Sequence, residues 1–113
     1  MVDVTLDVDA DPMPLVVLQA ETWELHVWAP LADLSRLSEI RSASWDERRS
    51  LQVGTCGDSP VFWVVADNGR ATVLIGQDDE TWDLALMIPL TAVDEIVALA
   101  VLITDVVDTA EGG

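Results

Sequence analysis

Lysine is absent from this chain of 113 residues, so five arginines are its only permanently charged basic side chains. They stand against 21 acidic residues, which gives a formal net charge of −16. The first 35 residues hold seven acids and the last 43 hold nine, with no arginine in either stretch. Such a negative field repels nucleic acids and anionic membranes and attracts basic surfaces. The composition therefore predicts a basic protein as the partner, with no nucleic acid and no membrane.

Cysteine and long apolar runs are scarce as well. Cys56 stands alone, which excludes an internal disulfide and a cysteine-based metal cluster and makes a reduced compartment the simplest setting. The longest apolar run, residues 96–103, is far shorter than the ~20 residues of a membrane span. The first nine residues lack the basic start and apolar stretch of a secretion signal. We therefore expect a cytoplasmic protein.

Residues that carry catalysis or bind metals form no recognisable motif. His26 and Cys56 are thirty positions apart, and neither has the neighbours of a metal-ligand motif. Residues 54–57 lack the lysine of a phosphate-binding loop, and the acidic stretch 78–83 lacks the glycine and glutamate positions of an EF-hand. We predict no catalytic residue, no metal site and no cofactor, and hence no enzyme.

Half of the residues are apolar, so the chain can bury a core as a single domain over residues 1–113. Residues 2–8 alternate valine or leucine with aspartate or threonine, which predicts a strand with one carboxylate face. Aspartates on a strand are tolerated in solvent at a sheet edge. There they either discourage edge-to-edge aggregation or meet a partner.

The remaining patterns predict an α+β fold with an antiparallel sheet of five to six strands. Short strands are expected at 15–18 and 22–28, and a short helix near 31–42 from the spacing of its apolar residues. Residues 51–88 predict a central meander of four strands, with an Asn-Gly hairpin turn at 67–69.

The C-terminal segment predicts a helix near 91–107, with Thr91 as its N-cap. Its residues are apolar nearly all round, so we expect the helix to be buried on most sides. The β-branched residues at 101–107 leave a strand there as an alternative.

The five tryptophans divide between core and surface. Trp63 and Trp82 lie on predicted strands and are expected in the core. Trp28 shares a predicted strand face with Glu24, and Trp45 lies in a polar turn between Ser44 and Asp46, so each is either packed in the core or an exposed anchor beside carboxylates. The predicted partner-binding residues are Trp28, Trp45, Asp46, Glu47, Asp78, Asp79, Glu80 and Asp83.

Residues 31–103 resemble a known family. The motif is Val53-Gly54-Thr55-Cys56-Gly57-Asp58, then Val61-Phe62-Trp63, Asp67-Asn68-Gly69, Gly76 and Ile88-Pro89-Leu90-Thr91-Ala92-Val93. It is similar to the small immunity proteins encoded beside bacterial polymorphic toxins, of the first-numbered immunity family type.

The resemblance implies an inhibitor that occludes the active or substrate-binding site of a cognate, basic toxin domain. Two alternatives remain open from the residues. One is an acidic DNA mimic of the anti-restriction or anti-CRISPR type, and the other is a self-associating adaptor whose last helix forms the interface. The sequence leaves monomer and homodimer open.

Overall fold

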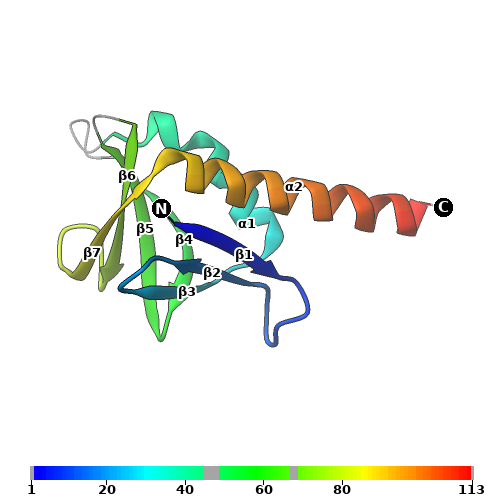
Figure 1. Ribbon diagram of the computed structural model, residues 1–113, viewed down its shortest axis with the longest axis horizontal. Helices are drawn as coiled ribbons and strands as arrows, with labels where there is room; N and C mark the ends of the chain where they lie inside the picture. The colour runs from blue at the N-terminus through cyan, green and yellow to red at the C-terminus, as the bar shows by residue number, and fades with distance from the viewer. Residues whose placement is uncertain (1, 45–48, 67–68, 113) are drawn as a thin grey trace.

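A computed structural model describes residues 2–44, 49–66 and 69–112, with the backbone alone for 105–112. The chain has the predicted α+β fold, and its named strands form one antiparallel sheet in sequence order (Figure 1). The sheet has seven strands rather than the five to six expected, because the N-terminal strands all join the meander. The strands are β1 Asp3–Asp7, β2 Leu15–Gln19, β3 Glu24–Trp28, β4 Leu51–Cys56, β5 Ser59–Ala66, β6 Arg70–Gly76 and β7 Trp82–Pro89.

The sheet consists of two halves that meet at one point. Strands β1 to β3 pair along their full lengths, and β5 to β7 pair over most of theirs, whereas β3 and β4 share the single pair Trp28 and Thr55. Gly54, beside that pair, has φ +82° and lies at a register shift in β4. The sequence-predicted meander over 51–88 is confirmed as β4 to β7. Of the predicted hairpin turn, only Gly69 is described, with φ +69°.

The segment predicted as a helix near 31–42 is α1, Leu31–Ser35, followed by the 3₁₀ helix η1, Arg36–Ser42. Leu34, Leu37 and Ile40 are fully buried and three residues apart. A 3₁₀ helix has 3.0 residues per turn, so Leu37 and Ile40, which both lie in η1, project on the same side of it. Together with the C-terminal helix, this segment covers one face of the sheet and encloses the core.

Helix α2, Leu90–Gly112, differs from the prediction in three ways. It stays helical through residues 101–107, so the strand alternative is wrong. It begins at Leu90, which places Thr91 inside the first turn rather than at the cap. It is not buried on most sides: it buries one side, through Ala92, Val93, Ile96 and Ala100, and beyond Ala100 it runs past the sheet (Figure 1), where Leu102 is 61% exposed.

The two tryptophans predicted to lie in the core, Trp63 and Trp82, have opposite environments. Trp63, on β5, is fully buried and donates its indole N–H to the Val53 carbonyl oxygen at 3.0 Å. Trp82 was also expected in the core, but it is 45% exposed. The prediction failed because β7 is the last strand of the sheet, and the described residues place no neighbour outside it.

Candidate functional site

The N-terminal half of the sheet exposes one side to solvent, which we call the open face. It follows from alternation: the even-numbered side chains of β1 and β2, with Leu25 and Val27 of β3, point into the core. Their neighbours point the other way. By register the open face has three rows, which are Asp3-Gln19-Glu24, Thr5-Val17-His26 and Asp7-Leu15-Trp28.

The open face combines an apolar centre with an acidic border. Leu15, Val17 and Trp28 are half-buried and do not belong to the core, whereas the carboxylates at the corners are exposed. Asp3 and Asp7 lie about 13 Å apart, because each strand residue advances ~3.3 Å. The prediction that Trp28 shares its face with Glu24 is confirmed. A partly exposed tryptophan beside other apolar side chains and carboxylates is a typical anchor for a protein partner.

His26 is engaged within the open face. Its Nε2 lies 2.5 Å from the Glu24 carboxylate, two residues earlier on the same side of β3. The contact holds both side chains in place beside Val17.

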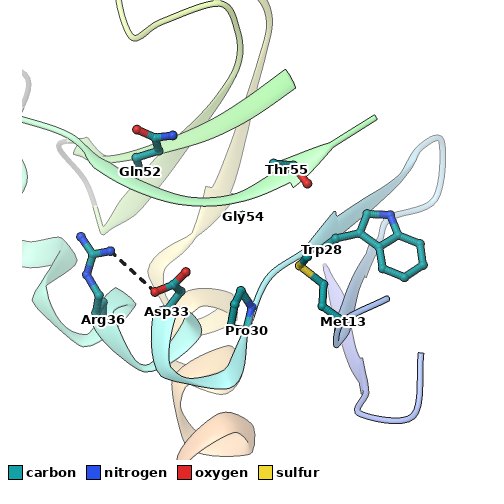
Figure 2. Close-up of a pocket in the computed structure, with 8 residues that line it drawn as sticks. All are labelled: Met13, Trp28, Pro30, Asp33, Arg36, Gln52, Gly54 and Thr55. Atoms are coloured by element: carbon teal, nitrogen blue, oxygen red, sulfur yellow. Dashed lines mark ion pairs between the residues drawn. The ribbon is translucent and has the colours of Figure 1, made fainter. Parts of the chain in front are cut away.

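A cleft of about 450 Å³ adjoins Trp28 where β3 and β4 diverge (Figure 2). The helical segment forms its floor, where Arg36 lies 3.9 Å from Asp33 across an exposed ion pair. Gly54 allows the strands to approach, since a Cβ there would lie 2.6 Å from Val27 Cγ1. The cleft is lined by Met13, Trp28, Pro30, Asp33, Arg36, Gln52, Gly54 and Thr55.

Two carboxylates of the acidic loop between β6 and β7 accept hydrogen bonds from within the protein. The Asp78 carboxylate accepts the backbone N–H groups of Glu80, at 2.8 Å, and Thr81, at 2.6 Å. These hydrogen bonds hold the pKa of Asp78 below its usual value. Asp79 accepts the hydroxyl of Ser50 at 2.7 Å. Two of the four predicted acidic anchors therefore stabilise the loop, while Glu80 and Asp83 are exposed.

The predicted binding residues do not form one surface. Trp28 is on β3, and the loop carrying Asp78, Asp79 and Glu80 follows β6, three strands farther along the order of the sheet. Asp83 lies on β7, beyond that loop. The second predicted patch, Trp45, Asp46 and Glu47, lies outside the described residues.

The sequence indicates the alternation of β1 but does not show that the outward residues of β1 share a surface with Trp28. Asp3, Asp7, Leu15 and Val17 complete the open face, and none of them was among the predicted binding residues. The available signal was the period of two in each strand, which fixes the side of every residue. The alternation does not determine the register between strands, which decides which residues lie side by side and which only the folded chain shows.

The described residues offer no other obvious chemistry. Among them, no three His, Cys, Asp or Glu side chains are arranged to hold a metal ion. No helix in the same part of the chain combines the length and hydropathy needed to cross a membrane. No family model, curated protein or solved structure matches the chain. The argument for function therefore depends on the surfaces themselves.

Proposed function

We propose that this protein is a non-enzymatic inhibitor that binds a basic protein on its open face. One observation carries the proposal: half-buried Leu15, Val17 and Trp28 share one side of the sheet with exposed Asp3, Asp7 and Glu24, and no helix of the described residues packs on that side. Apolar side chains supply the energy of close contact, and the carboxylates select a cationic partner.

The charge of the whole chain assists the encounter. A net charge of −16 creates a long-range attraction for a basic protein, which raises the association rate at low salt. The acidic border then orients the partner over the apolar centre. The adjoining cleft offers room for a partner side chain next to Trp28, with Asp33 on its floor. On this surface the carboxylates therefore attract the basic partner, and the apolar side chains hold it in place.

The particular function that we propose is immunity to a cognate bacterial toxin, with the protein acting in the cytoplasm. The support is the sequence resemblance over residues 31–103 together with the acidic surface. A rigid sheet that presents a flat, acidic patch is suited to cover a basic substrate-binding site. Inhibition by steric occlusion requires no catalytic group on this chain.

Titration against the protein encoded by the neighbouring gene tests this function. We expect submicromolar binding and loss of the toxin's activity, with lysozyme and cytochrome c as basic proteins that serve as non-cognate controls. Absence of binding at micromolar concentration would reject the cognate-pair proposal. Displacement of duplex DNA from unrelated nucleases would instead favour the DNA-mimic alternative.

Two tryptophan variants test the location of the site. Trp28→Ala removes the anchor of the open face and should weaken binding by about tenfold or more. Trp82→Ala removes a more exposed tryptophan from β7, at the other edge of the sheet, and should leave the affinity unchanged. Asp7→Asn should mainly slow association, and the effect should shrink at high salt. The reverse order of the two tryptophan effects would move the site to β7.

A further inference from the structure

The outer edge of β7 presents an uncovered apolar strand. Three large side chains along it are strongly exposed: Trp82 at 45%, Leu84 at 45% and Met87 at 54%. The strand is eight residues long and, within the described chain, pairs with β6 alone. Its outward backbone N–H and C=O groups are therefore available for a further strand.

The usual protection of a sheet edge is weak here. Edge strands are commonly kept short, charged, or interrupted by proline. Strand β7 carries one charge, Asp83, close to its start, and its proline, Pro89, is its last residue. A bulge between Trp82 and Leu84 is the one irregularity, and it leaves residues 84–89 in regular register with β6. This half of the strand is a ready template for pairing.

We propose that β7 pairs antiparallel with β7 of a second copy of this chain. The distribution of charge at the edge favours that occupant and that direction. The acidic residues Glu80 and Asp83 lie at the start of the strand, whereas the Arg70 guanidinium lies 3.5 Å from the Met87 sulfur near its end. A two-fold axis perpendicular to the sheet brings the acidic end of each strand beside Arg70 of the other copy. Parallel pairing would place acid against acid.

The same axis also matches apolar side chains. Residues that lie opposite each other in an antiparallel pair share one side of the sheet. In the register centred on Ala85, Leu84 faces Leu86 of the second copy. The pairing therefore covers exposed Leu84 while it satisfies the outward backbone groups of β7.

The net charge does not forbid this contact. Strand β1, with its row of aspartates, and β7 are the first and last strands in the order of the sheet. The Debye length is about 8 Å at physiological ionic strength, so repulsion between exposed carboxylates farther apart than this is largely screened. In the dimer the two open faces stay at opposite ends of a continuous sheet, which leaves the proposed inhibitory site accessible.

Sedimentation equilibrium of the full chain tests the dimer. Between 1 and 200 µM in 150 mM salt, the mass should rise from 12.3 kDa to twice that value. Leu84→Glu should weaken self-association at least tenfold, because it places a charge in the interface. Thr5→Glu, with the same change of charge on the exposed side of β1, is the matched control and should not alter it. A strict monomer over the whole range overturns the proposal.

A charge exchange tests the direction of pairing and does not depend on Leu84. Arg70→Asp and Asp83→Arg should each weaken the dimer several-fold, because each places like charges together, and the double variant should restore it. Leu102→Glu examines the exposed part of α2. A dimer abolished by Leu102→Glu but unaffected by Leu84→Glu would place the interface on the helix and overturn this inference. Binding of a basic protein is measured separately, so either proposal can fail alone.

Discussion

Strands β1 and β7 form the two edges of the same sheet, but their side chains protect the exposed backbone from further pairing to different extents. Strand β1 has five residues and turns Asp3, Thr5 and Asp7 outward, so a second strand would meet carboxylates. Strand β7 has eight residues and exposes Trp82, Leu84 and Met87. One edge therefore resists pairing, and the other invites it. The comparison teaches that the high net charge of this protein does not protect it uniformly.

The two halves of the sheet also differ in burial and in charge. Strands β1 to β3 bury one side only and carry the open face. Strand β5 buries Val61, Phe62, Trp63 and Val64 in succession, so it is packed on both sides. The four-stranded half is thus the apolar body of the protein, and the three-stranded half is its acidic surface. Their single shared pair, Trp28 and Thr55, places the cleft at the boundary.

The largest predicted effect contrasts the centre of the apolar half with its edge. Trp63→Ala should lower the free energy of unfolding by about 3–5 kcal/mol, because it leaves a cavity in the core and removes a buried hydrogen bond. Trp82→Ala should cost below about 1 kcal/mol, as expected for a largely exposed side chain. Urea denaturation at 1 µM, where little dimer is expected, measures both. Equal losses would contradict the assignment of β7 to the edge.

A smaller effect is expected where the halves meet. Gly54→Ala should cost about 2–4 kcal/mol, because alanine is strained at φ +82° and its Cβ would collide with Val27 and the Trp28 carbonyl. Gly57→Ala is the matched control. Its φ is +63° but its Cβ would meet nothing within 4 Å, so only backbone strain of about 1–2 kcal/mol is expected. Comparable losses in the two variants would show that the strands are not tightly packed at the junction.

The smallest effect concerns the helical layer behind the sheet. Arg41 donates to both carboxylate oxygens of Asp94 at 2.9 and 3.0 Å, which ties η1 to α2. This pairing lowers the pKa of Asp94, so its contribution to stability is present at neutral pH and is lost as the pH falls through that lowered pKa. Asp94→Asn should therefore destabilise the protein slightly at pH 7 and match the unmodified chain in strong acid.

Thermal denaturation at pH 7 and at successively lower pH values measures this difference. Glu95→Gln is the control, since it removes one neighbouring exposed carboxylate for which the structure gives no arginine contact. A difference between Asp94→Asn and the unmodified chain that persists at the lowest pH would show that the ion pair is not its cause. The surface position of both side chains keeps the expected change below those of the other two predictions.

Much of the fold could be predicted because its signals are local. The alternation in residues 2–8 defined both faces of β1, and the strand and turn pattern of residues 51–88 identified the four-stranded meander. The spacing of Leu34, Leu37 and Ile40 located the helical turn. Such patterns depend on the periods of strands and helices, which are properties of the backbone alone.

The errors concern where each element ends up relative to the others. Trp82 has the composition of a core residue, and its exposure follows from the position of β7 at the edge of the sheet. Leu102 has an apolar sequence context, but α2 has by then left the sheet. Asp78 and Asp79 look like free acidic residues in the sequence, and they are hydrogen-bonded within the folded chain.

By itself, the sequence determined the surplus of negative charge, the class of fold and the side on which most strand residues lie, because each depends on composition or on local periodicity. The tertiary structure alone decided which strand is last in the sheet, how far the core reaches along α2, and that Trp28 shares a surface with Asp3 and Asp7. Those features depend on the register and order of strands distant in the chain, and pairing between distant segments is fixed only when the whole core packs together.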